Sequence, residues 1–73
     1  MTVAVLKRIR KQKGFYTQDT LALATGITRQ SVGAYEKGKR KAKKPYTLAI
    51  AYVLETKVEK LFKDDGQATT EEI

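Results

Sequence analysis

The residues with the clearest capacity for specific chemistry lie on a short polar helix that the sequence predicts at residues 29–37. Arginine can donate two parallel hydrogen bonds to guanine, glutamine can pair in the same way with adenine, and alanine can contact the methyl group of thymine. We therefore expect this helix and its first flanking residue to contact DNA bases; the alternative is that these side chains are only solvated helix positions. The expected base contacts are Thr28, Arg29, Gln30 and Ala34.

Two short helices joined by a tight turn must position these side chains, and residues 18–38, QDTLALATGITRQSVGAYEKG, have this pattern. Gly26 follows the first helix, where it can adopt a positive φ without a Cβ clash. Thr28 is a suitable N-cap for the second helix. Val32 and Tyr35 are three residues apart and face inward. The pattern is typical of a helix-turn-helix, which lays its second helix in the major groove of DNA.

A strongly basic loop follows this helix: residues 39–44, KRKAKK, carry five positive charges in six positions. Its place favours contact with DNA phosphates, although basic loops also occur as plain solvated surface or as nuclear-localisation or heparin-type patches. Hydroxyl and amide groups near helix N-termini can donate to phosphates too, or serve only as caps in solvent. The expected phosphate contacts are Thr17, Gln18, Ser31, Lys37, Lys39, Arg40, Lys41 and Lys44.

The charge of the chain is unevenly distributed. Residues 1–44 hold twelve Lys or Arg against Asp19 and Glu36, a balance of +10, and residues 45–73 hold three Lys against six acids, a balance of −3; together they give the net +7. A basic region concentrates anionic partners and speeds encounter with nucleic acid. The basic part coincides with the helix-turn-helix, so double-stranded DNA is the expected partner.

Several other classes of protein are excluded by composition. The chain has no cysteine and no histidine, which removes disulfides, zinc fingers and the usual metal ligands. Ser31 therefore has no histidine partner, and no phosphate-binding glycine loop is present. We expect no enzyme, no cofactor or metal and no small-molecule ligand. No apolar run is long enough to span a bilayer, and the N-terminus is unlike a secretory signal, so no membrane association is expected.

A first helix is predicted at residues 2–13, where Val5, Leu6 and Ile9 form an inner stripe and Gly14 ends the helix.

Two further helices are predicted after the basic loop, at residues 46–54 and 58–63. Residues 64–73, DDGQATTEEI, are polar and acidic, which is typical of a flexible tail. We therefore expect one domain over residues 1–63.

An ordered set of motifs across residues 5–62 resembles the Cro/CI-type (XRE) repressors of phages and bacteria. The family's first helix ends in Leu-x-x-x-Arg, which here is Leu6-Lys7-Arg8-Ile9-Arg10. Its later helices carry Ile-Ala-x-x-Leu and a short hydrophobic segment, here Ile50-Ala51-Tyr52-Val53-Leu54 and Val58-Glu59-Lys60-Leu61-Phe62. The resemblance implies an all-α, five-helix, lambda-repressor-like DNA-binding domain with the helix-turn-helix at its second and third helices.

The resemblance also implies a structural ion pair between Arg10 and Glu36, since the family pairs the Arg that ends its first helix with a Glu two residues before the glycine after the third. The alternative is two unrelated surface charges. Glu55 and Thr56 depart from the family, which often has Gly and an apolar residue there; because Glu disfavours a left-handed turn, we expect the fourth helix to run on or end differently. Gly33 lowers the stability of the recognition helix by about 1 kcal/mol relative to Ala. Either the glycine allows close approach to DNA, or the loss of stability is simply tolerated.

A domain this small has little core to spare for a terminal apolar helix. We therefore expect Val58, Leu61 and Phe62 to contact a second copy of the chain; the alternative is that Leu61 and Phe62 only cap the core of the monomer. The aromatic residues alternate with aliphatic ones at helical spacing, which favours core or dimer-face positions over stacking platforms for nucleic acid. They are Phe15, Tyr35, Tyr46, Tyr52 and Phe62.

Together these patterns predict a sequence-specific DNA-binding transcriptional regulator, acting as a repressor and as a homodimer on a two-fold operator. Its two recognition helices would lie about 34 Å apart. A phage switch protein, a restriction–modification controller and an antitoxin all fit, in the cytoplasm of a prokaryotic or phage-infected cell. The alternative is a basic interaction module that binds RNA or a protein partner without sequence-specific contacts to DNA.

Overall fold

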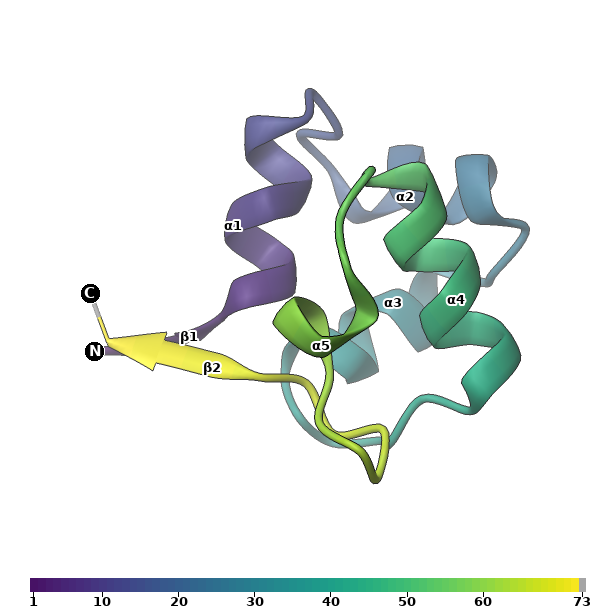
Figure 1. Cartoon of the computed structure of the whole chain (residues 1–73). Coiled ribbons are helices and arrows are strands. Elements are labelled where there is room, and N and C mark those ends of the chain that lie inside the picture. The colour runs from purple at the N-terminus through teal and green to yellow at the C-terminus, as the bar shows by residue number, and fades with distance from the viewer. Residues whose placement is uncertain (73) are drawn as a thin grey trace.

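The computed structural model describes residues 1–72 and contains five helices and two short strands in these residues (Figure 1). The helices form one compact group, and the two strands extend from it as a small ribbon near the chain termini. The elements are β1 (Thr2–Ala4), α1 (Val5–Gln12), α2 (Gln18–Thr25), α3 (Arg29–Glu36), α4 (Lys44–Val53), α5 (Val58–Leu61) and β2 (Thr70–Glu72).

Local sequence explains where the central helices begin and end. The backbone N–H of Thr20 donates to Thr17 Oγ1 over 3.3 Å at the start of α2. The backbone N–H of Ser31 donates to Thr28 Oγ1 over 3.2 Å at the start of α3. Gly26 ends α2 with φ +75°, a conformation open to a residue without Cβ. Caps of this kind contribute about 1 kcal/mol each, so these short helices have well-defined ends.

The core draws on every helix. Its fully buried side chains each remove an apolar surface from water, which stabilises the fold by about 1.5–3 kcal/mol per side chain. The Tyr35 and Phe62 rings add an edge-to-face contact with centroids 6.4 Å apart. The largest fully buried side chains are Leu6, Leu21, Val32, Ile50, Leu54 and Leu61.

The N-terminus differs from the prediction. We expected a helix from residue 2, but α1 begins at Val5 and residues Thr2–Ala4 form β1. This strand pairs antiparallel with β2, with Val3 opposite Glu71. The description as all-α therefore holds only approximately. The partner strand is almost the whole chain away in sequence, so no local pattern could have indicated it.

The C-terminal segment also differs from the flexible tail that we expected. The backbone N–H of Thr69 donates to the carbonyl of Leu61 over 2.9 Å, and Ala68 is buried and forms a bridge with Phe62. The segment then continues into β2. The folded unit therefore extends past the boundary predicted at residue 63 and includes the rest of the described chain.

The apolar residues of α5 lie inside the monomer. Leu61 is 0% exposed and Phe62 2% exposed, and Val58 is half-buried against the core. Leu61 and Phe62 therefore cap the monomer core, which was the alternative to a dimer contact, whereas Val58 keeps part of its surface exposed and its dimer contact stays a prediction. Tyr52 is 85% exposed, so of the two predicted positions, core or dimer face, the core is excluded and the dimer face stays a prediction.

Helix α4 ends in a left-handed turn despite the absence of glycine. Glu55 has φ +55°. The backbone N–H of Glu55 donates to the carbonyl of Tyr52 and that of Thr56 to the carbonyl of Ala51, over 3.1 and 3.0 Å. These are the two hydrogen bonds of a Schellman motif. Our expectation that Glu would prevent this turn was wrong: Glu55 adopts the left-handed conformation, and the two backbone hydrogen bonds close the end of the helix.

We predict that Glu55→Gly raises the free energy of unfolding by up to about 1 kcal/mol, because removing Cβ relieves a left-handed strain of about 1–2 kcal/mol at the cost of extra chain entropy. Glu55→Ala is the matched control, since it removes the carboxylate and keeps the strain. Denaturant unfolding of both variants measures the effect. Equal stability of the Gly and Ala variants would contradict this explanation.

None of the helices within residues 1–72 is long and apolar enough to cross a membrane.

Candidate nucleic-acid interface

The helix-turn-helix has the geometry that its sequence predicts. Helices α2 and α3 pack against each other. Gly26 makes the turn and Ile27 fills it, with 8% of its surface exposed. Val32 and Tyr35 face the core. Since each helical residue rotates by about 100°, the opposite side of α3 is left to solvent.

The exposed side of α3 carries the residues expected to contact bases. Gln30 and Lys37 are exposed, Ala34 is half-exposed and the Arg29 side chain is 69% exposed. A shallow hollow of about 290 Å³ lies on this side. Its lining consists of Gln18, Arg29, Gln30, Gly33, Ala34, Lys37 and Lys39. The structure thus brings three of the four predicted base-contacting residues onto one surface, and Thr28 caps the helix at its edge.

Gly33 has a structural explanation. A Cβ at this position would lie 3.0 Å from Oε1 of Gln18, closer than an ordinary contact. The missing side chain leaves room for Gln18, the first residue of α2, to lie against the middle of α3. Close packing between the two helices is therefore a reason for glycine at this position within the protein itself.

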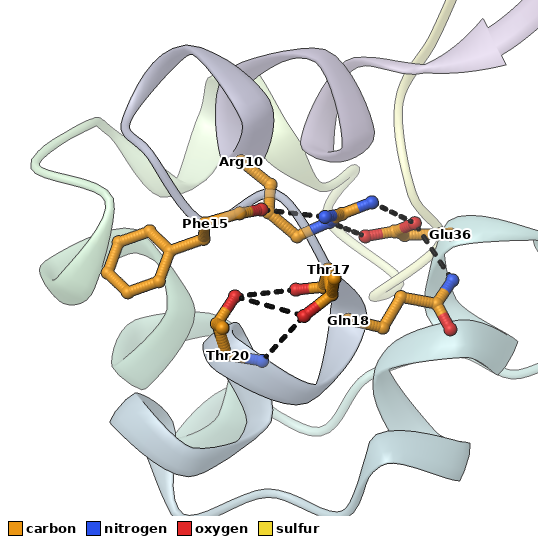
Figure 2. A network of polar contacts seen from close by, with 6 residues as sticks. All are labelled: Arg10, Phe15, Thr17, Gln18, Thr20 and Glu36. Carbon is orange, nitrogen blue, oxygen red and sulfur yellow. Dashed lines mark hydrogen bonds and ion pairs between the residues drawn. The ribbon is translucent and has the colours of Figure 1, made fainter.

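A buried ion pair ties α1 to the end of α3 (Figure 2). Nε of Arg10 lies 2.7 Å from Oε2 of Glu36, and both side chains are only 3% exposed. Nη1 of Arg10 also donates to the carbonyl of Phe15 over 2.7 Å, in the connection to α2. The sequence left two alternatives for Arg10 and Glu36, an ion pair or two unrelated surface charges. The structure contains the ion pair, and it is buried.

Gln18 joins this network from α2. Its Nε2 donates to Oε1 of Glu36 over 3.1 Å, so one carboxylate holds α1, α2 and α3 together (Figure 2). An ionised carboxylate only accepts hydrogen bonds, which fixes the Gln18 amide with its nitrogen toward Glu36. No buried side-chain nitrogen or oxygen within residues 1–72 lacks a partner. A fully satisfied network of this kind fixes a single arrangement of its elements.

We predict that Glu36→Ala lowers the free energy of unfolding by about 3–5 kcal/mol, because the substitution leaves the Arg10 charge buried without its partner. The matched control is Asp19→Ala, which removes the exposed ion pair of Asp19 Oδ1 with Arg29 Nε at 3.5 Å. Exposed pairs contribute about 0–1 kcal/mol. Urea unfolding of the two variants gives the comparison, and similar losses in both would contradict a buried role for Glu36.

The basic loop after α3 is held by the C-terminal segment. The backbone N–H of Ala42 donates to the carbonyl of Gly66 over 2.9 Å, and Nε2 of Gln67 donates to the carbonyl of Gly38 over 3.1 Å. Ala42 is 6% exposed. The sequence did not predict this contact between the basic loop and the C-terminal segment. The one local signal for it was the turn-forming sequence Asp-Asp-Gly before Gln67.

An ion pair between Asp65 and Lys41 adds to the contact between the C-terminal segment and the basic loop. Oδ2 of Asp65 lies 3.4 Å from Nζ of Lys41, and Oδ1 of Asp65 accepts from the backbone N–H of Gln67. The Gln67 hydrogen bond and the nearby Lys41 ammonium lower the pKa of the Asp65 carboxyl. Because the pKa of Asp65 is lower in the folded state, its carboxylate contributes to the free energy of unfolding at pH values above the unfolded-state pKa. This contribution to stability is lost as the pH falls through the folded-state pKa.

We predict that Gly66→Ala lowers the free energy of unfolding by about 2–5 kcal/mol, because its Cβ would overlap the carbonyl oxygen of Ala42 in addition to the backbone strain at φ +90°. Gly14→Ala is the matched control: it has the same φ of +90° but no atom within 4 Å of the added Cβ, so it should lose only about 1–2 kcal/mol. Thermal unfolding measures both, and equal losses would mean that Gly66 does not pack against the loop.

The residues expected to contact phosphates have different surroundings in the structure. Thr17 caps α2, and Ser31 accepts hydrogen bonds from Thr28 and Arg40. Lys41 faces Asp65. The others are Gln18 in the buried network and Lys37, Lys39 and Lys44, which are exposed and make no ion pair within residues 1–72.

Fold and surface together define a helix-turn-helix DNA-binding domain. The model of the helix-turn-helix family matches residues 6–61, and the chain belongs to this family, which is of the XRE or Cro/CI type. Its members form a family of DNA-binding transcription regulators and are not typically enzymes. A comparison with curated proteins finds no match for this chain.

Proposed function

We propose that this protein is a sequence-specific transcriptional repressor, which binds double-stranded DNA as a homodimer. The observation that carries the proposal is the exposed polar side of α3, presented by a capped helix-turn-helix and flanked by a basic loop. Such a helix enters the major groove with its N-terminal residues against the base edges.

Roles for the individual residues follow from where they lie. Arg29, Gln30 and Ala34 contact base edges, with Thr28 at the margin of the same surface. Arg29 can leave its exposed pair with Asp19 at little cost, because such pairs contribute about 0–1 kcal/mol. Contacts to phosphate come from the exposed cations and from groups at helix N-termini: Thr17, Gln18, Ser31, Lys37, Lys39, Lys41 and Lys44. Arg40, for which the sequence predicts the same role, is held instead against Ser31.

Homodimer binding is part of the proposal because one small domain has few base contacts. Two copies related by a two-fold axis would place their α3 helices one helical turn of DNA apart, about 34 Å, and would match a two-fold operator. Leu61 and Phe62, being buried, take no part in the contact between the copies. Occupation of a promoter by such a dimer excludes polymerase, which is the simplest route to repression.

A second candidate function is a charge-driven interaction module that binds RNA or a protein partner without contacts to specific DNA bases. The concentration of positive charge, +10 over residues 1–44, favours this candidate as well. The two functions differ in whether affinity depends on base sequence.

We predict that Gln30→Ala costs about 1–3 kcal/mol of binding free energy on a preferred duplex and much less on random DNA. Lys39→Ala should weaken binding to both duplexes and reduce the slope of log K against log salt by about 0.9, one phosphate contact. Fluorescence anisotropy across a salt series measures both. If each of the two substitutions lowers the affinity for the preferred duplex and for random DNA by the same factor, the protein is a charge-driven binder and the repressor function fails.

A further inference from the structure

Two neighbouring cations of the basic loop contact different parts of the fold. Nη1 of Arg40 donates to Oγ of Ser31 over 3.0 Å, which places the guanidinium against α3. Nζ of Lys41 lies 3.4 Å from Asp65, which places the ammonium against the C-terminal segment. The sequence alone gives these residues the same role, but the structure distinguishes them.

The anchor of Arg40 is in the first turn of α3. The Ser31 hydroxyl also accepts a hydrogen bond from Oγ1 of Thr28 over 2.9 Å, and Thr28 in turn accepts from the backbone N–H of Ser31. The N-cap therefore fixes the position of the hydroxyl that holds Arg40. The N-terminal turn is the part of a recognition helix that comes nearest to base edges.

Helical geometry places Arg40 beside the residues that are expected to contact bases. At about 100° per residue, Ala34 lies between Gln30 and Ser31 around the axis of α3. Gly33 lies on the other side of Gln30, where Gln18 packs against it. The exposed ridge of α3 is therefore bordered by Gln18 on one side and by Arg40 on the other.

We infer that Arg40 is a specificity-determining residue that contacts a guanine next to the bases contacted by α3; the inference rests on the proposed function. A guanidinium has five N–H donors, so the hydrogen bond to Ser31 leaves a pair of donors for the O6 and N7 acceptors of guanine. Anchoring by Ser31 lowers the entropy lost when this long side chain is ordered on DNA. A lysine ammonium lacks this planar pair of donors and therefore selects guanine less strongly than arginine does.

The test is selection of bound duplexes from a random pool by the parent protein, Arg40→Ala and Lys41→Ala. The parent should enrich a sequence with a guanine that Arg40→Ala no longer prefers, so that discrimination at this base pair falls by about tenfold or more. Lys41→Ala should keep the complete preference, because losing a phosphate contact lowers affinity on every duplex alike and does not change the preferred sequence. Ser31→Ala should weaken the preference at the same base pair, because it releases the guanidinium. Arg40 and Lys41 are exposed, and melting curves verify that all variants are folded.

A second measurement uses 7-deazaguanine in place of that guanine, which removes the N7 acceptor. The parent should lose affinity several-fold, by about the strength of one hydrogen bond, and Arg40→Ala should not change. If Arg40→Ala keeps the preferred sequence and loses affinity equally on all duplexes, Arg40 holds a phosphate and the inference is overturned. If the parent itself shows no preferred sequence, the proposed function fails, and with it the role of Arg40.

Discussion

The buried pair of Arg10 and Glu36 is the interaction on which the rest of the structure depends. Taking two charges out of water is costly, and the cost is recovered only when both groups find all their hydrogen-bond partners. Here those partners are the Phe15 carbonyl before α2 and the Gln18 side chain at its start. The pair is therefore satisfied only when α1, α2 and α3 adopt one arrangement, and that arrangement exposes the polar side of α3.

A second constraint comes from the C-terminal segment, which divides the positive charges into two groups. Asp65 and Glu71 pair with Lys41 and Arg8, so these cations are partly balanced within the chain. Lys39 makes no ion pair within the part of the chain that the structure describes and lies beside the hollow on α3. The acidic segment thus fixes the basic loop, and Lys39 keeps a charge, unpaired within residues 1–72, beside the recognition helix.

The sequence could predict features that depend on residues close together along the chain, but not those that depend on residues far apart. Helix caps and the turn at Gly26 depend on residues within a few positions, so the second helix of the helix-turn-helix could be located to within about one residue at each end. The pairing of β1 with β2 joins opposite ends of the chain and has no local signal. The left-handed conformation of Glu55 runs against the preference of a residue with a Cβ, so the local sequence pointed away from it. The different contacts of Arg40 and Lys41 depend on Ser31 and on the distant Asp65, so the sequence of the basic loop alone could not distinguish the two residues.

The central claim, that the exposed side of α3 recognises a DNA sequence, is tested most directly by a ratio of affinities. The measurement compares the dissociation constant for the best duplex selected from a random pool with that for a scrambled duplex of the same composition, at physiological salt. Sequence-specific proteins of this kind bind their site about 10³-fold or more tightly than other DNA. We expect a ratio of at least that order on a two-fold symmetric site, and a ratio near one would contradict the account.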